Sequence, residues 1–373
     1  MMLPRARLIA WLLPILLVSV ITYAADVETL AIGAQAPDFS LPGVDGKTYT
    51  LADFSDADVL VIVFTCNHCP TAQAYEARLQ QLAADYKDKG VALVAISPND
   101  PLAVRLDELG YTDVGDSFDD MKNRAELRGF TFPYLYDGDV QEVSKAYGPV
   151  STPHVFVFDK ERKLRFAGRI DDNDDPAKVK SHDTRNAIDA LLEGKPVPVE
   201  TTKTRGCSIK WSDKRGTVQE SLDRWAQEPV DLQRVGVDGI QEIMKNDSKN
   251  LRLVNVWATW CGPCVYEFPQ LVEMNRMYRG RDFDMVTISG DEIDNEENVL
   301  AFLKKNEAST RNYIFHSDDE YAMIEAVDPE WQGNLPYTVL IAPGGEIIYR
   351  HESMIDPLEL KRAIVDYLGR TYN

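Results

Sequence analysis

The chain has 373 residues, enough for two domains with separate hydrophobic cores. Its content of 44% hydrophobic and 27% charged residues excludes a disordered chain and a multi-span membrane protein. The formal net charge of −20 argues against a nucleic-acid partner, because phosphate binding needs clustered Lys and Arg. We interpret the excess of acidic residues as a solvated surface.

The first 24 residues have the pattern of an export signal. Arg5 and Arg7 precede an apolar stretch over residues 8–22, and the small residues Ala24 and Ala25 follow. The stretch is short for a membrane-spanning helix, so we predict a signal peptide over residues 1–24, with an uncleaved anchor as the alternative. In either case the rest of the chain is expected outside the cytoplasm, in the periplasm or the cell envelope.

The five cysteines fall into two close pairs and one single residue. Cys66 and Cys69 form one Cys-x-x-Cys pair, Cys261 and Cys264 form the other, and Cys207 has no near partner. A disulfide that closes so small a loop hardly constrains the unfolded chain, so both pairs are read as redox centres rather than structural bridges. Half of a zinc site is the alternative, but zinc needs two further ligands, and the second half offers no such pair.

Hydrophobic periodicity in the first half predicts strands and helices around the first pair. The apolar run at 58–64 is typical of a buried parallel strand, and it leads directly into the first cysteine. The further elements expected in chain order are a helix at 71–86, strands at 91–96, 132–136, 155–158 and 163–168, and a helix at 185–192.

The second half repeats this order of elements. We expect strands at 251–257, 283–288, 338–341 and 346–349, with helices from the second cysteine pair to 278, at 297–305 and at 357–368. Residues 196–235 are polar and weakly patterned, and we interpret them as a linker. The prediction is an α/β protein with one domain at 25–195 and another at 236–373.

Both halves resemble the thioredoxin superfamily. The second half resembles the TlpA/ResA type of exported reductase, and the first half resembles the peroxiredoxin-like (AhpC/TSA-type) redoxin domains. The residues that carry the resemblance of the second half are Trp257 to Cys264, Glu267, Pro269 and Pro336. The residues that carry the resemblance of the first half are Ala36, Pro37, Asp38, Phe39, Leu41, Gly46, Lys47, Leu51 and Phe54. The resemblance implies two thioredoxin-like domains in tandem.

Disulfide exchange needs a cysteine thiolate, and a helix N-terminus stabilises one. Unpaired backbone amides and the helix dipole favour negative charge at that point. Each cysteine pair follows a strand and opens a helix. We therefore predict that Cys261 and Cys66 attack, and that Cys264 and Cys69, one helical turn later, resolve the mixed disulfide.

Glu267 lies three residues after Cys264, on the same helical face. We predict that its carboxyl group exchanges a proton with the resolving thiol, as the resemblance implies. The alternative is an acid that only complements the helix dipole.

The resemblance also implies a substrate groove in each domain. Pro336 and Pro153 occupy the position of a cis-proline beside the redox centre. The preceding residues, Leu335 and Thr152, are expected to pair with a peptide backbone. We expect Trp260 to contact substrate in the second domain. The alternative is an ordinary trans-proline before each strand.

The residues between the paired cysteines differ between the two motifs. Gly262 and Pro263 separate the second pair, whereas Asn67 and His68 separate the first. A histidine beside the attacking thiolate stabilises the reduced form, so we predict that the first centre is the more oxidising. A surface histidine with little effect is the alternative.

Two rival functions for the first domain fit its sequence less well. A peroxidase of the peroxiredoxin kind has Pro-x-x-x-Thr-x-x-Cys, but Thr65 stands directly before Cys66 and four residues before Cys69. A copper carrier would use Cys66, Cys69 and a histidine, although its usual motif has one more residue between the cysteines. We predict no resident metal and no cofactor.

The sequence thus predicts an exported thiol–disulfide oxidoreductase with two Cys-x-x-Cys centres. Protein dithiols and disulfides, those of apocytochromes c among them, are its expected substrates, and a membrane thiol relay its expected electron donor. Cys207 is either a third redox thiol that exchanges with Cys66 or Cys69, a contact thiol for a partner, or an inert packed cysteine.

Overall fold

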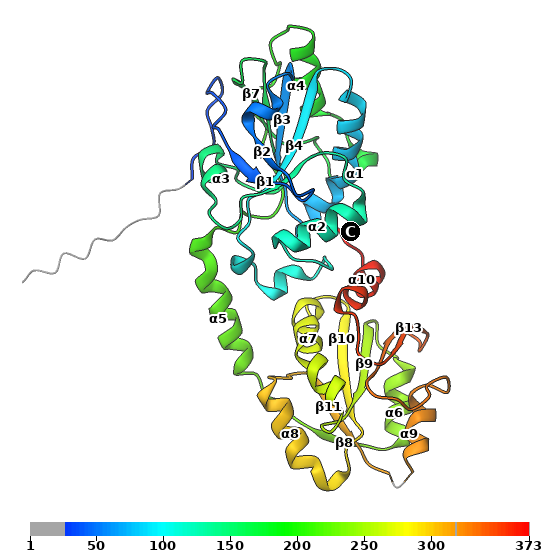
Figure 1. Cartoon of the computed structure of the whole chain (residues 1–373). Helices are drawn as coiled ribbons and strands as arrows, with labels where there is room; N and C mark the ends of the chain where they lie inside the picture. The colour runs from blue at the N-terminus through cyan, green and yellow to red at the C-terminus, as the bar shows by residue number, and fades with distance from the viewer. Residues whose placement is uncertain (1–26, 318, 373) are drawn as a thin grey trace, which may run out of the picture.

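The computed structural model describes residues 27–317 and 319–372 and shows two α/β domains joined by a long helix (Figure 1). The predicted signal peptide lies outside the described residues. Within the described part of the chain, none of the helices combines the length and apolar character needed to cross a bilayer.

The first domain has a central five-stranded sheet in the order β5-β4-β3-β6-β7. Strands β3, β4 and β5 are parallel, whereas β6 pairs antiparallel with β3, and β7 pairs antiparallel with β6. The elements are β1 (Ser40–Pro42), β2 (Thr48–Thr50), β3 (Val59–Phe64), α1 (Pro70–Tyr86), β4 (Val91–Ser97), α2 (Phe118–Arg128), β5 (Tyr134–Tyr136), α3 (Glu142–Tyr147), β6 (His154–Phe158), β7 (Leu164–Gly168) and α4 (Asp183–Leu192).

The second domain has a six-stranded sheet in the order β13-β12-β9-β10-β11-β8. Its central strand β9 again pairs with a parallel neighbour, β10, and an antiparallel one, β12. The elements are β8 (Gln233–Val235), α6 (Val237–Lys245), β9 (Leu251–Trp257), α7 (Gly262–Tyr278), β10 (Phe283–Ser289), α8 (Glu296–Lys305), β11 (Arg311–Phe315), α9 (Glu320–Val327), β12 (Tyr337–Ile341), β13 (Ile347–Glu352) and α10 (Pro357–Leu368). The predicted pair of α/β domains with mixed sheets is therefore confirmed.

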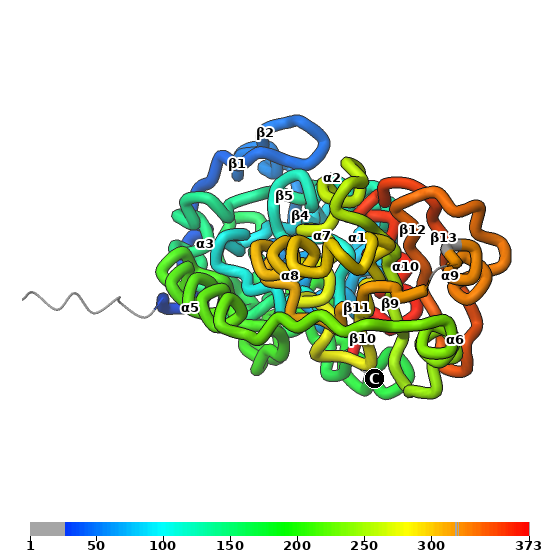
Figure 2. Tube along the Cα trace, turned by 90° about the horizontal axis from the view of Figure 1, so that it is seen from below, coloured from blue at the N-terminus to red at the C-terminus, as the bar shows by residue number. Residues whose placement is uncertain are grey.

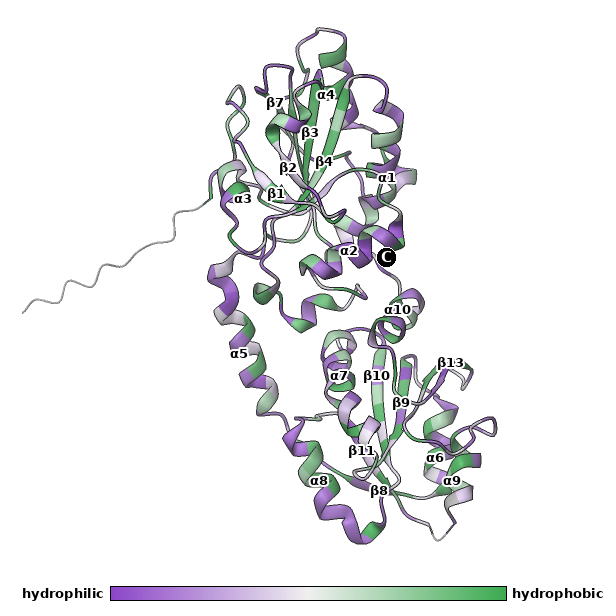
Figure 3. Cartoon of the chain, in the orientation of Figure 1, coloured by the Kyte–Doolittle hydropathy of each residue, from purple (hydrophilic) through white to green (hydrophobic). Residues whose placement is uncertain are grey.

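The central strands carry the core on both faces of each sheet. In β3, Val59, Val61 and Val63 pack into one cluster, while Leu60, Ile62 and Phe64 pack into another on the opposite face. Alternation of side chains along a strand produces this division. These strands are the most hydrophobic parts of the sheets in Figure 3, and each buried aliphatic side chain contributes about 1.5–3 kcal/mol.

The linker at 196–235 contains regular structure that its weak pattern did not predict. Residues Arg215–Ala226 form helix α5, and β8 joins the edge of the second sheet beside β11. Figure 2 shows the chain after α5 crossing the second domain to reach α6. Tertiary contacts stabilise these elements, among them the burial of Trp225 on α5 beside Arg276 of α7 and Arg279, which directly follows that helix.

A loop of the first domain, residues 110–116, makes the main polar contacts with the second domain, and we call it the interdomain loop. The hydroxyl of Tyr278, at the end of α7, donates to the carbonyl oxygen of Thr112 over 2.8 Å. The fully buried Asp113 carboxylate pairs with Arg124 of its own domain and with Arg362 and Arg370 of the other. These contacts hold the two domains together.

Candidate redox centres

The second cysteine pair lies where strand β9 gives way to helix α7. Cys261 is the N-cap residue of α7, and its sulfur accepts a hydrogen bond from the amide of Cys264 over 3.3 Å. The two residues form a disulfide with a Cα–Cα distance of 5.3 Å. The prediction that Cys261 stands at a helix start is confirmed, and the amides there favour a thiolate on this residue once the bond is reduced.

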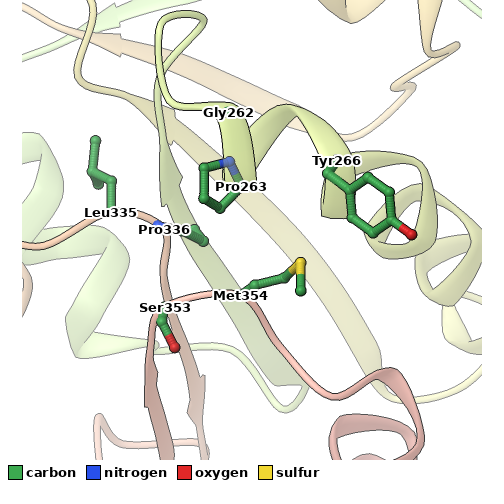
Figure 4. A pocket seen from close by; sticks show the side chains of 7 residues that line it. All are labelled: Gly262, Pro263, Tyr266, Leu335, Pro336, Ser353 and Met354. Atoms are coloured by element: carbon green, nitrogen blue, oxygen red, sulfur yellow. The ribbon is translucent and has the colours of Figure 1, made fainter.

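An apolar groove of about 630 Å³ opens beside this disulfide (Figure 4). In Figure 4, Pro263 and Tyr266 of α7 lie across the groove from Met354 and Pro336. Tyr266 is 70% exposed, so its ring is available to a partner. The complete lining consists of Gly262, Pro263, Tyr266, Leu335, Pro336, Ser353 and Met354.

Two sequence predictions concern the surroundings of this disulfide. The Leu335–Pro336 peptide bond is cis, as expected from the resemblance. Trp260, directly before Cys261, exposes 71% of its surface. Large exposed aromatic side chains are typical of protein interaction sites. Tyr266 and Met354 were missed at the sequence level, because only the folded chain brings α7 and the segment after β13 together.

Glu267 is buried on the second turn of α7, three residues after Cys264. Its carboxylate accepts hydrogen bonds from the side-chain amide of Asn255 and from the backbone N–H of Ile355, at 3.1 and 2.8 Å. Burial raises the pKa of this carboxyl group to about 7, and the two hydrogen bonds only partly oppose the effect. A group with this pKa can take up and release a proton near neutral pH.

The first cysteine pair is arranged differently from the prediction. Helix α1 begins at Pro70, and Cys69 is its N-cap residue, whereas Cys66 lies three residues before it. The expectation that Cys66 sits at the helix start is therefore wrong. Proline lacks an N–H and favours the first helical position, so Pro70 sets the start of the helix one residue after Cys69.

Strand register shows which residues of the two centres correspond. Phe64 of β3 pairs with His154, the residue after Pro153, and Val256 of β9 pairs with Tyr337, the residue after Pro336. Cys69 stands five residues after Phe64, as Cys261 does after Val256. By the same count Cys66 corresponds to Ala258, and Ala72 corresponds to Cys264. Cys69 thus occupies the position of Cys261.

The three cysteines of the first domain form one cluster. Cys66, Cys69 and Ala72 are buried together, and the partly exposed Cys207 packs against them. The Cys69 thiol faces the carbonyl oxygen of Thr152 at 3.3 Å, and the backbone N–H of Cys207 donates to the Cys69 sulfur over 3.3 Å. The Cys66 sulfur lies 3.1 Å from the Thr152 hydroxyl.

The surroundings separate the pKa values of these thiols. Burial alone would disfavour a charge on Cys69, but hydrogen bonds from Cys207 and Cys66, together with the nearby His68, lower the pKa of Cys69 well below its usual range. Burial raises the pKa of Cys66, and its hydrogen bond with Cys69 and the carboxylate of Asp116 act in the same direction. Of these two thiols, the surroundings therefore favour ionisation of Cys69 over that of Cys66.

His68 is a buried residue, 1% exposed, so the surface alternative is wrong. Its Nδ1 lies 2.6 Å from the Asp116 carboxylate. Burial works against a charged imidazole, but Asp116 outweighs it and raises the pKa of His68. No motif marks Asp116, which lies 48 residues after His68 in the chain and reaches the centre through the interdomain loop.

Cys66, His68 and Asp116 offer three metal-ligating atoms within 4.8 Å of one another. This set differs from the Cys66, Cys69 and histidine set of the copper hypothesis. The Asp116 carboxylate already accepts hydrogen bonds from the amides of Asn67 and His68, from the His68 ring and from Asn99. Through these bonds Asp116 holds the segment between Cys66 and Cys69 in place, and a bound metal would have to displace some of them.

The groove predicted at Thr152 and Pro153 is closed in the first domain. Both residues are buried, and their peptide bond is cis, as expected. The backbone N–H of Thr152 donates to the carbonyl oxygen of Cys207 over 2.9 Å, so the chain itself supplies the peptide that pairs here.

A cysteine at the start of a helix, after the central strand of a mixed sheet, is the arrangement of a thioredoxin-like protein, and it occurs here twice. Comparison with known proteins agrees. Residues 32–167 match the AhpC/TSA family, and residues 232–363 match the Redoxin family. The chain therefore contains two thioredoxin-like domains in tandem, one matched by each family model.

Individual relatives point to redox chemistry. The chain is 27% identical to the thiol-disulfide oxidoreductase ResA of Bacillus cereus over 144 residues, which are 38% of this chain and 72% of that protein. It is 28% identical over 119 residues to a Mycobacterium tuberculosis protein that carries the name peroxiredoxin, covering 32% of this chain and 64% of that one. A solved hypothetical protein of Sinorhizobium meliloti is 36% identical, with 50% of this chain and 97% of the other covered and a TM-score of 0.44. The relatives named as thiol-disulfide oxidoreductases support an oxidoreductase activity.

Proposed function

We propose that the protein is an exported thiol–disulfide oxidoreductase that reduces disulfides of protein substrates at Cys261 and Cys264. The observation that carries this proposal is a Cys-x-x-Cys disulfide at a helix N-terminus, opening on an exposed apolar groove. An extended peptide of a substrate can place apolar side chains in the groove while its disulfide meets Cys261. Disulfides of exported proteins, such as apocytochromes c, are the proposed targets.

The proposed reaction moves two electrons from the protein to the substrate. The Cys261 thiolate attacks one sulfur of the substrate disulfide, forming a mixed disulfide and releasing the first substrate thiol. Cys264 then gives up its proton, for which Glu267 is the nearby acceptor, and attacks Cys261. This step releases the second substrate thiol and forms the Cys261–Cys264 disulfide, which a membrane thiol relay reduces again.

Insulin reduction tests the assignment. With dithiothreitol as the electron source, the full-length protein is expected to precipitate the insulin B chain, and Cys261→Ser to lower the rate to that of dithiothreitol alone. Cys66→Ser is the matched control and is expected to retain the rate. Activity that survives Cys261→Ser would contradict the proposal, whereas a Cys264→Ser variant is expected to retain covalently bound substrates that mass spectrometry can identify.

Peroxide reduction is a second candidate for the first domain. The match of residues 32–167 to the AhpC/TSA family and the lowered pKa of Cys69 favour it. Against it, Thr65 stands four residues before Cys69 instead of three, so the hydroxyl of the peroxidase motif is out of place. Peroxide consumption that depends on Cys69 would establish this activity, and we expect none above the Cys69→Ser background.

A further inference from the structure

A short segment after the first domain, residues 206–208, lies in that domain's own groove. Cys207 forms an antiparallel bridge with Thr152, the residue before Pro153. Gly206 approaches so closely that a Cβ atom there would lie 1.9 Å from the Thr152 carbonyl oxygen. The corresponding place in the second domain, at Leu335 and Pro336, is the open groove of Figure 4. In the first domain the chain therefore fills the site where the second domain is free to receive a peptide.

The same segment brings a thiol to the nucleophile. The Cys207 N–H donates to the Cys69 sulfur, and both sulfurs belong to the buried cluster that also contains Ala72. Cys69 has the helix N-cap position of Cys261, but the resolving position one turn later is Ala72 and carries no sulfur. The first domain thus has an activated cysteine whose partner must come from elsewhere.

We propose that Cys69 and Cys207 are the redox pair of the first domain, with segment 206–208 serving as a built-in substrate strand. This inference rests on the disulfide exchange proposed above and extends it to a second centre with a different pair of residues. The first Cys-x-x-Cys motif, Cys66 and Cys69, is then not the functional pair.

Cys66 is the rival partner, and its surroundings are less favourable. It is 3% exposed, and burial, its hydrogen bond with Cys69 and the nearby Asp116 carboxylate all raise the pKa of its thiol. The pKa of Cys207 is also raised, first by its hydrogen bond with Cys69, then by burial and by the Cys69 charge. The contributions of Cys69 disappear once its sulfur is bonded to another sulfur, which leaves burial and Glu108 to oppose the Cys207 thiolate and Lys210 to favour it.

The exchange balances with a disulfide as the only co-reactant. The Cys69 thiolate attacks one sulfur of a partner disulfide, forming a mixed disulfide and releasing one partner thiolate, which takes up a proton. The Cys207 thiol loses its proton to solvent and attacks the Cys69 sulfur, which expels the second partner thiol. Two electrons leave Cys69 and Cys207, and the partner disulfide becomes two thiols.

Reaction with oxidised glutathione tests the pair on the full-length protein. The reduced protein is mixed with oxidised glutathione, quenched with iodoacetamide and mapped by mass spectrometry. We expect a Cys69–Cys207 disulfide in the wild type and in Cys66→Ser. In Cys207→Ser we expect glutathione to remain on Cys69 about ten-fold longer or more, because the intramolecular attack is lost. A Cys66–Cys69 disulfide in the wild type, or persistent glutathione in Cys66→Ser instead of Cys207→Ser, would overturn the inference.

A backbone variant tests the strand without removing a thiol. Gly206→Ala places a methyl group against the Thr152 carbonyl, so the segment must leave the groove. We expect Cys69–Cys207 formation to slow about ten-fold or more, while insulin reduction at Cys261 is unchanged. An unchanged rate of Cys69–Cys207 disulfide formation would contradict the proposal that segment 206–208 places Cys207 at Cys69. Because the mapping of Cys69 and Cys207 is independent of Cys261, failure of this inference and failure of the proposed function are distinguishable.

Discussion

The buried carboxyl group of Glu267 gives the second domain a stability that depends on pH. In the folded protein its pKa is about 7, against an ordinary value of 4.5. Between these pH values the unfolded chain releases the proton of Glu267 while the folded chain retains it. The wild type therefore loses stability as the pH rises from 4.5 to 7 and loses no more above that range. At 1.36 kcal/mol per pKa unit, the loss is about 3 kcal/mol.

A Glu267→Gln variant isolates this contribution because its side chain does not titrate. The amide cannot accept both hydrogen bonds that Asn255 and Ile355 donate, which costs about 1 kcal/mol at every pH. The difference in unfolding free energy between variant and wild type is expected to move by about 3 kcal/mol in favour of the variant between pH 4 and pH 8. Urea unfolding at several pH values measures this difference.

Glu273→Gln is the matched control on the same helix. Glu273 is only half-buried and pairs with Lys361 at the surface, so its substitution is expected to change stability by less than about 1 kcal/mol. A Glu267→Gln difference that changes by no more than this between pH 4 and pH 8 would refute the argument that burial keeps the proton on Glu267. In insulin reduction, the wild-type rate is expected to rise with pH around 7, and this rise is expected to disappear in Glu267→Gln.

Three further predictions concern other parts of the molecule. His68→Asn removes the imidazole that helps to lower the pKa of Cys69, so we expect the ultraviolet absorbance of the Cys69 thiolate to appear at higher pH and the first centre to become less oxidising. An unchanged titration of Cys69 would contradict this role of His68. Asp113→Ala leaves Arg362 and Arg370 without their buried partner, so we expect the unfolding free energy to fall by about 3–5 kcal/mol and the radius of gyration in small-angle scattering to increase. Unchanged values would contradict the role of Asp113 in holding the two domains together. The pKa of Asp113 is about 2, so its contribution is present above pH 4 and is lost as the pH falls toward 2. Tyr266→Ser is expected to raise KM for insulin several-fold with little change for a small disulfide, and an equal effect on both would argue against the groove.

The sequence predicted the parts of the fold that local pattern determines. Strand β9 and helix α10 begin and end at the expected residues, because an unbroken apolar run and a Pro-started amphipathic helix are strong local signals. Helix α5 and strand β8 were not predicted, since they owe their stability to contacts with the second domain.

The candidate sites were predictable to a similar extent. The cysteines, Glu267 and the two prolines were found from motif and spacing. The correspondence between Cys69 and Cys261 was not, because the matching Cys-x-x-Cys spacing suggested Cys66 as the equivalent residue. Only the pairing of β3 with β6 and of β9 with β12 shows the shift of three residues. Asp116 was missed because it joins the site across a long stretch of chain.

The interdomain loop gives the first centre a structural dependence on the second domain. At one end, Asp116 orients His68 beside Cys69. A few residues earlier, Thr112 and Asp113 are held by side chains of α7, α10 and the segment after α10. If the halves were produced as separate polypeptides, the loop that carries Asp116 would lose its contacts with the second domain, and Asp116 would hold the His68 imidazole less firmly. Dissecting the protein at the linker would therefore alter the chemistry of Cys69 as well as the architecture.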